Sequence, residues 1–200
     1  MFTLFNYGNR FGDAGICECL YDYILAWQDN VDMVIVLLIA AQNLALTALN
    51  RSRLGRAGVC KLILTAVNRY KTNEFVIEYG FMAIQKLALD EHNCFVMYEM
   101  NVSVLLVKTI RTFLLNESII ELGSMAIMNI SASGNPEIVQ SLEMAGVAEC
   151  IATLLLKFVT EAEIIEYNLI AISNLAACSE NPKVYGQVGV ADSMAVIIKH

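Results

Sequence analysis

The sequence predicts an all-α solenoid of about four and a half repeats, each built from three helices. The first observation is a short motif that recurs at intervals of 43, 43, 45 and 43 residues. It consists of a glycine or asparagine, then valine or isoleucine, then a small residue, and each copy opens a stretch of apolar residues at the helical period. The copies begin at Gly15, Gly58, Asn101, Gly146 and Gly189.

A second motif follows in each of the first four repeats and has the same period. It consists of asparagine or lysine, then leucine or isoleucine, then alanine or serine, at intervals of 43, 43 and 45 residues. Because two landmarks share one spacing, we interpret them as true repetition. The motif begins at Asn43, Lys86, Asn129 and Asn174, and we number the surrounding helix from these residues as position zero.

Helix caps and turn formers divide each repeat into three helices. Asparagine can accept from the free backbone N–H groups of a helix start, and proline suits the first turn. A glycine, or Asn101, then permits a sharp bend into the second helix, because these residues tolerate positive φ. First helices are expected to start near Asn50, Asn93, Asn135 and Asn181, and third helices after Asn30, Asn73, Asn116 and Thr160. The repeats would then span about 1–49, 50–92, 93–134 and 135–180, with a partial repeat at 181–200.

Composition favours a globular chain inside the cell. With 57% hydrophobic and 16% charged residues, the chain can bury a large core. The longest uncharged stretch, Met33 to Asn50, contains Gln42 and Asn43, whose polar groups would lack partners in lipid, so we expect no membrane span. The first residues lack the pattern of a signal peptide. We expect a cytoplasmic or nuclear protein whose six cysteines are reduced.

The net charge of −7 disfavours nucleic acid as a partner and is compatible with a basic protein segment. One basic cluster, Arg51, Arg53 and Arg56, lies on an expected first helix. It would either contact an acidic partner or be solvated, and we favour solvation. Trp27 ends a second helix and is interpreted as a packing residue.

Two segments, NPEIVQSLEMAG at residues 135–146 and AISNLA at residues 171–176, resemble the armadillo repeat family, and the resemblance extends over nearly the whole chain. It implies a right-handed superhelix whose third helices line a concave groove. In peptide-binding members of the family, the asparagine at position zero binds the backbone of an extended partner. The matching residues are Asn43, Asn129 and Asn174, whereas Lys86 departs from the pattern.

Members of the family that carry nuclear signals have tryptophan at position −4. This chain has Ile39, Met82, Met125 and Ile170 there. The resemblance therefore disfavours a role as a nuclear-transport adaptor.

The helical period of 100° per residue separates two sides of each third helix without reference to the family. Positions −9, −6, −5, −2 and +2 cluster on one side and are mostly apolar or small, so we predict that they form the core. Positions 0, −4, −7, −8 and −11 lie on the other, open side. The candidate groove residues are Asn43, Lys86, Asn129 and Asn174 at zero, Met82, Met125 and Ile170 at −4, Tyr79 and Tyr167 at −7, and Glu78, Glu121 and Glu166 at −8.

An accessible apolar stripe edged with carboxylates is typical of a partner site. We therefore expect a protein-interaction scaffold that binds an extended, partly basic segment along this groove. A structural alternative stays open. The apolar residues would then pack between adjacent third helices, the glutamates would form a solvated face, and the asparagines would bond neighbouring loops.

A second hypothesis is a structural segment of a larger assembly, such as a cytoskeletal or axonemal complex. The sequence stops at VADSMAVIIKH, a second helix with no third helix after it, and the first repeat has an incomplete first helix. Because solenoid ends need polar caps, we expect either a fragment of a longer array or self-association through apolar ends.

We expect no enzymatic activity, no cofactor and no metal site. The chain has two histidines, His92 and His200, and adjacent loop residues such as His92 and Cys94 usually point apart. A zinc set that includes Cys17 and Cys19 is disfavoured, because other repeats carry small residues at the same positions. The glycine pairs at 55–58 and 186–189 lack the strand and lysine of a phosphate loop.

Overall fold

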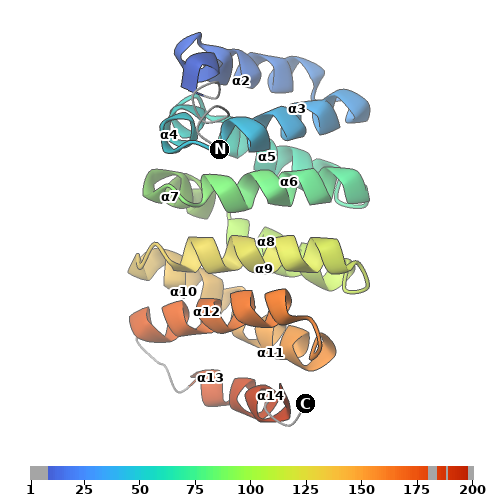
Figure 1. Cartoon of the computed structure of the whole chain (residues 1–200), viewed down its shortest axis with the longest axis vertical. Helices are drawn as coiled ribbons and strands as arrows, with labels where there is room; N and C mark the ends of the chain where they lie inside the picture. The colour runs from blue at the N-terminus through green and yellow to red at the C-terminus, as the bar shows by residue number, and fades with distance from the viewer. Residues whose placement is uncertain (1–8, 180–183, 188, 198–200) are drawn as a thin grey trace. The chain divides into compact units, whose positions relative to one another are not determined.

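The computed structural model describes residues 9–179, 184–187 and 189–197, and helices are the only regular secondary structure within these ranges (Figure 1). The chain divides into two compact units, residues 1–102 and 103–200. The first unit contains α2 (Ile16–Trp27), α3 (Val31–Leu44), α4 (Ala48–Arg56), α5 (Val59–Arg69), α6 (Glu74–Leu87) and α7 (Glu91–Glu99). The second contains α8 (Val102–Thr112), α9 (Glu117–Ser131), α10 (Pro136–Met144), α11 (Val147–Lys157), α12 (Ala162–Cys178), α13 (Val184–Gln187) and α14 (Val190–Ile197). The predicted all-α class is thus confirmed for the described residues.

Equivalent helices of successive repeats pack on one another within each unit. In the first unit α2 packs on α5, and α3 packs on α6, which lies beside it in Figure 1. In the second unit α9 packs on α12 and α11 packs on α14. The sides that meet are apolar, and Ile63 of α5 and Ile77 of α6 are completely buried. Burial of such side chains is the main favourable contribution to folding.

Asparagine caps begin the third helices α3, α6 and α9, as predicted. The Oδ1 atoms of Asn30, Asn73 and Asn116 each accept from the backbone N–H three residues later, at 3.1, 3.1 and 3.2 Å. The fourth third helix, α12, begins one residue later than predicted, with Glu161 at the N-cap. The hydroxyl of Thr160, the predicted cap, bonds to the Glu161 carboxylate instead, at 2.9 Å.

The first-helix caps agree with the prediction only in part. Asn135 caps α10 and accepts from the N–H groups of Glu137 and Ile138 at 2.9 and 3.3 Å, with Pro136 in the first turn. Helices α4 and α7 start near Asn50 and Asn93 as predicted, but the capping role of these asparagines is wrong, because Thr47 caps α4 and Asp90 caps α7, three residues earlier. The predicted start at Asn181 lies outside the described residues.

Asn50 and Asn93 are instead completely buried contacts between repeats. The Nδ2 group of Asn93 donates to the carbonyl of Leu87, at the end of α6, at 3.1 Å and to that of Arg51, in α4, at 3.0 Å. The Asn93 Oδ1 atom lies so close to Gly55 that a Cβ atom there would be 1.7 Å away. Gly12 faces Asn50 in the same way, at 1.9 Å. Each glycine therefore makes room for an asparagine of the next repeat.

The bends into the second helices have left-handed backbone conformations, as predicted. Gly15, Gly58, Gly146 and Gly189 have φ between 79° and 85°, and Asn101 has φ of 56°. These are the only residues before a second helix that need positive φ in the described chain, and the recurring motif supplies each of them.

We expect Gly58→Ala to lower the free energy of unfolding by about 1–2 kcal/mol, because an L side chain is strained at positive φ. A Cβ atom at this position would also lie 3.1 Å from the Tyr21 ring. Chemical denaturation monitored by circular dichroism measures the change. The matched control is Gly186→Ala, where a Cβ atom meets nothing within 4 Å. Equal destabilisation by the two variants would contradict the assigned backbone conformation.

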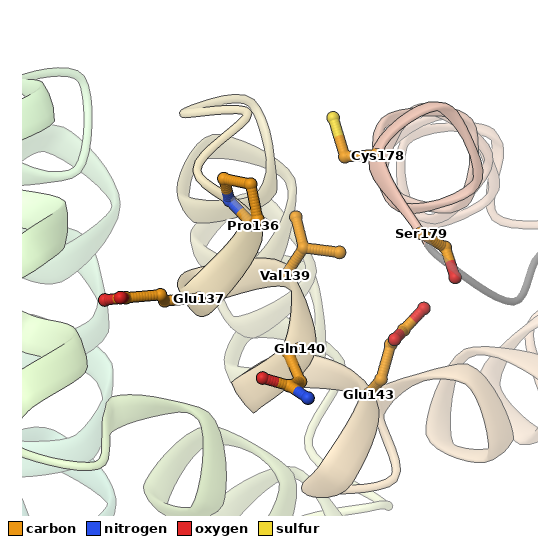
Figure 2. Close-up of a pocket in the computed structure, with 7 residues that line it drawn as sticks. All are labelled: Pro136, Glu137, Val139, Gln140, Glu143, Cys178 and Ser179. Carbon is orange, nitrogen blue, oxygen red and sulfur yellow. The ribbon is translucent and has the colours of Figure 1, made fainter.

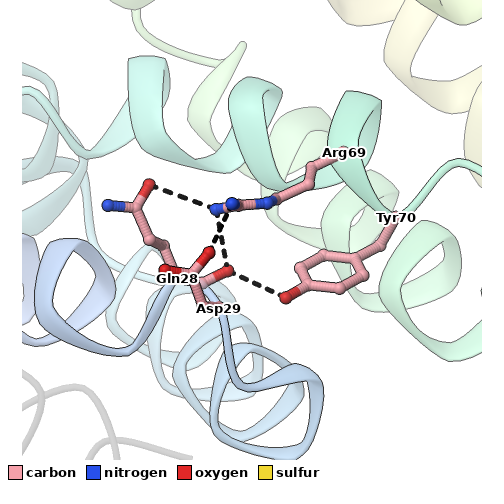
Figure 3. A network of polar contacts seen from close by, with 4 residues as sticks. All are labelled: Gln28, Asp29, Arg69 and Tyr70. Carbon is pink, nitrogen blue, oxygen red and sulfur yellow. Dashed lines mark hydrogen bonds and ion pairs between the residues drawn. The ribbon is translucent and has the colours of Figure 1, made fainter.

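A polar network joins the end of α5 to the turn between α2 and α3 (Figure 3). The Arg69 guanidinium forms an ion pair with Asp29 and donates to the Gln28 carbonyl at 3.3 Å. The Tyr70 hydroxyl donates to the same carbonyl at 2.9 Å. The ion pair is solvent-exposed and contributes little to the free energy of folding. The network nevertheless connects the turn after α2 directly to the end of α5 in the next repeat.

Within the described residues, no single helix combines the length and the apolar character of a membrane span, although the bent pair α10 and α11 meets these criteria when taken together. The uncharged stretch from Met33 to Asn50 is interrupted, because α3 ends at Leu44 and α4 begins at Ala48.

Candidate protein-binding face

The predicted division of the third helices into a core side and an open side is clearest in α6. All five predicted core positions of this helix are buried, and the methyl groups of Val67 fill the space beside one of them, Gly80. The four candidate groove positions are all partly exposed. The buried residues are Ile77, Gly80, Phe81, Ile84 and Ala88, and the partly exposed residues are Glu78, Tyr79, Met82 and Lys86.

In the first unit, the residues at position zero belong to one chain of polar contacts. The Lys86 ammonium of α6 contacts Oε1 of Gln42 in α3. The Nε2 group of Gln42 in turn donates to Oδ1 of its neighbour Asn43 at 3.0 Å. Partial burial lowers the pKa of Lys86, because removal from water disfavours the charged form. Lys86 therefore bridges two third helices.

In the second unit, the Asn174 side chain of α12 bonds to the preceding third helix, α9. Its Nδ2 group donates to the Met128 carbonyl at 3.3 Å and to the Ser131 hydroxyl at 3.2 Å. This contact agrees with the structural alternative for the asparagines, although the partner is a helix instead of a loop. Asn174 and Asn129 both remain partly exposed.

Carboxylates gather along the open side of α9 and α12. The Tyr167 hydroxyl lies close enough to three carboxylates for their negative charges to disfavour its ionised form. These carboxylates belong to Glu121 of α9 and to Glu163 and Glu166 of α12. Partial burial, followed by repulsion from these carboxylates, raises the pKa of Tyr167. Neither helix contains a lysine or an arginine. The carboxylates on the open side of α9 and α12 therefore have no basic residue within their own helices.

Apolar side chains lie beside these carboxylates. Met125 of α9 is partly exposed, and Ile170 of α12 is 40% exposed. Both occupy position −4, where the period predicted an accessible apolar residue. An apolar strip beside carboxylates can bind the aliphatic stem of a basic side chain and also its charge.

Sequence reasoning missed a buried polar contact beneath this face. Asn168 of α12 is completely buried, and its Nδ2 group donates to the Ser124 hydroxyl of α9 at 2.9 Å and to the Ile164 carbonyl at 2.7 Å. Position −6 was predicted only as core. The sequence did contain a signal for this contact, because an asparagine at a core position of one repeat accompanies a serine at a core position of the repeat before it. Buried polar groups need partners, so the two could have been expected to pair.

The candidate catalytic and metal-binding side chains do not come together in the described residues. His92 is exposed, whereas Cys94 is buried and its thiol donates to the Ala88 carbonyl at 3.0 Å. Burial raises the pKa of both Cys60 and Cys94 to about 12, so these thiols stay protonated at neutral pH. No group of three His, Cys, Asp or Glu side chains in the described part of the chain is arranged to hold a metal ion.

The basic cluster on α4 requires a correction, because two of its members make internal contacts. Arg53 pairs with Asp13 at 2.6 Å, and Arg51 donates to the Ala45 and Leu46 carbonyls beyond the end of α3 at 3.2 and 3.4 Å. The sequence favoured solvation of all three arginines, and of the three this interpretation describes only Arg56. Trp27, which was expected to pack at the end of a second helix, is 45% exposed.

A cavity of about 410 Å³ lies between α10 and the end of α12 (Figure 2). The Glu143 carboxylate points toward Ser179, whereas the Glu137 carboxylate points away from it (Figure 2). The Glu143 carboxylate also accepts a hydrogen bond from Tyr185. The sequence did not predict this cavity. It is lined by Pro136, Glu137, Val139, Gln140, Glu143, Cys178 and Ser179.

Among known proteins, no family model matches this chain and no curated protein sequence matches it. The chemistry of the open side of the third helices is therefore the basis for assigning a function.

Proposed function

We propose that this chain is an armadillo-type α-solenoid that binds an extended, partly basic segment of a partner protein along the open side of its third helices. One observation carries the proposal. The open side of α9 and α12 has several carboxylates, no basic residue in either helix, and accessible apolar side chains at position −4.

The chemistry of these residues defines the partner. Glu121 and Glu166 would pair with lysine or arginine side chains of the segment, while Met125 and Ile170 would contact its apolar parts. Amide groups such as Asn129 would bond its backbone, as in strand-like peptide recognition generally. In the first unit Lys86 occupies the corresponding place and would repel a basic residue, so we propose that the basic part of the segment lies on α9 and α12.

Removing two carboxylates tests this proposal directly. We expect Glu121→Gln with Glu166→Gln to weaken binding of basic peptides about tenfold at low salt, since exposed ion pairs contribute about 0.2–1 kcal/mol each. The probes are fluorescent extended peptides with clustered lysines and arginines, selected on a peptide array, and fluorescence anisotropy gives Kd. Because both glutamates are replaced by isosteric amides, the fold is expected to be preserved.

The matched control is Glu137→Gln with Glu149→Gln, which removes the same charge from exposed positions on α10 and α11. This control should bind the selected peptides like the unaltered chain. Equal weakening by both double variants would mean that only net charge matters, and the proposed face would be wrong. A second pair, Asn129→Ala with Asn174→Ala, should also weaken binding, and unchanged affinity would exclude a role for the amides.

A further inference from the structure

The ammonium group of Lys86 has no compensating carboxylate in the described part of the chain. Burial lowers its pKa, and no neighbouring carboxylate acts in the opposite direction. Glu78 is the nearest carboxylate before Lys86 on α6, and it lies eight residues away, which is about 12 Å along the helix axis. Asp90, four residues after Lys86, caps α7 through the backbone N–H of Asn93 at 3.1 Å. Among the described residues, the partly buried charge of Lys86 therefore lacks a partner of opposite sign.

Two amides hold this ammonium group in place on the open side of the third helices. The Oε1 atom of Gln42 in α3 accepts from Lys86. The Nε2 group of the same amide donates to Oδ1 of Asn43 at 3.0 Å, so Asn43 fixes the orientation of the Gln42 amide from its other end. A lysine ammonium has three N–H donors, and Gln42 accepts from one of them. Lys86 is partly exposed, so its other two donors are available to a ligand.

Large apolar side chains continue from Lys86 along the same side of α6. The residues four, seven and eleven positions before Lys86 lie within about 60° of arc around the helix. They are Met82, Tyr79 and Phe75. Phe75 is 62% exposed, and the other two are partly exposed. We name these three residues and Lys86 the α6 stripe, which contains no carboxylate.

The α6 stripe differs in charge from the open side of α9 and α12. Lys86 is the only basic residue in α3 and α6, whereas α9 and α12 have carboxylates and no basic residue. Glu163 of α12 occupies the same position in its repeat as Phe75 in α6. The two surfaces therefore fit parts of a ligand that carry opposite charges.

A carboxylate is the group that would complete the site at Lys86. It would supply the missing negative charge and accept from the N–H groups that Gln42 leaves, and hydrogen bonds between charged groups are the strong ones. The side chains of Met82 and Tyr79 offer apolar contact area next to this charge. The site thus fits an acidic residue that has a large apolar residue as its neighbour.

We propose that the α6 stripe binds an acidic residue of the partner segment, with its carboxylate on Lys86 and a large apolar residue on Met82 and Tyr79. This inference rests on the proposed function, because it assigns a second part of the same segment. The segment then has charges of both signs, with a basic part on α9 and α12 and an acidic, apolar part on α6. Basic residues throughout the segment would place one of them against Lys86, where like charges repel.

Peptides with a movable glutamate test the inference. Each fluorescent peptide contains one basic cluster that binds the unaltered chain, with neutral residues on both sides. A glutamate beside a leucine is moved through these neutral residues one position at a time, and fluorescence anisotropy gives Kd. At one position we expect glutamate to strengthen binding about tenfold relative to glutamine, as expected for one hydrogen-bonded pair of charges.

Variants of Lys86 identify the residue responsible. Lys86→Gln should abolish the gain from glutamate, because a neutral amide can still bond to Gln42 but does not attract a carboxylate. Lys86→Arg retains the charge and should keep most of the gain. The matched control is Lys61→Gln, which removes the same charge from an exposed position on α5 and should keep the gain in full. Thermal unfolding followed by circular dichroism verifies that each variant is folded.

The outcomes separate this inference from the proposed function. Glu121→Gln with Glu166→Gln should weaken binding of all these peptides and leave the gain from glutamate unchanged. If the basic clusters bind but glutamate strengthens binding at no position, the inference is wrong and the proposed function stands. The same holds if Lys86→Gln and Lys61→Gln reduce the gain equally. If no basic cluster binds the unaltered chain, the proposed function is wrong and this inference fails with it.

Discussion

Replacing Gly55 with alanine is expected to destabilise the first unit by about 2–4 kcal/mol, because it combines overpacking with the loss of buried hydrogen bonds. The added Cβ atom would lie 1.7 Å from the Asn93 Oδ1 atom, so the asparagine must move. Movement breaks its bonds to the Leu87 and Arg51 carbonyls, of which the bond to Leu87 is buried and the bond to Arg51 is partly buried. Urea denaturation measures the loss.

A double-mutant cycle identifies the cause. Asn93→Ala alone removes the two hydrogen bonds, and it also removes the atom with which the new methyl group collides. The double variant Gly55→Ala with Asn93→Ala should therefore lose less stability than the sum of the single changes, by about 1–2 kcal/mol. Additive losses would show that Gly55 and Asn93 do not share one contact.

Ile84→Ala in α6 is expected to lower the free energy of unfolding by about 2–5 kcal/mol, through lost apolar burial and the cavity that remains. Ile84 is 1% exposed and occupies core position −2. The control is Met82→Ala, two residues earlier on the partly exposed side of the same helix, where about 1 kcal/mol is expected because burial is incomplete. Both variants introduce alanine into a helix, so helix propensity does not distinguish them. Comparable losses would contradict the assignment of the two sides.

The helical class, the positive-φ bends and the core sides of α3, α6 and α9 could be predicted from sequence, because each depends on local chemistry. In α12 the predicted core residues Ile165, Leu169 and Ala176 are partly exposed. Gly58 and Asn101 mark bends through their backbone freedom, and Ile77 and Ile84 mark a core side through the helical period. These properties are set within one turn of helix, and the repetition of each pattern distinguishes it from coincidence.

The contacts between repeats could not be predicted in the same way. Asn93 was expected to cap a helix because asparagine is a good cap, but Asp90 is equally suitable and lies three residues earlier. Whether Asn93 caps the helix or is buried depends on Gly55, which is 38 residues away and leaves the space that the buried asparagine occupies. The pairings of Asn168 with Ser124 and of Lys86 with Gln42 likewise depend on the three-dimensional register.

The buried bond between Asn168 and Ser124 has a consequence for the way in which the second unit opens. Separating α12 from α9 would break the bond to Ser124 and leave Asn168 with only its bond to the Ile164 carbonyl in its own helix until water enters, so partial separation is more costly than complete separation. The two helices should therefore lose their backbone protection together, as one cooperative segment. Transient opening of this unit would then expose its apolar interior in a single step instead of fraying helix by helix.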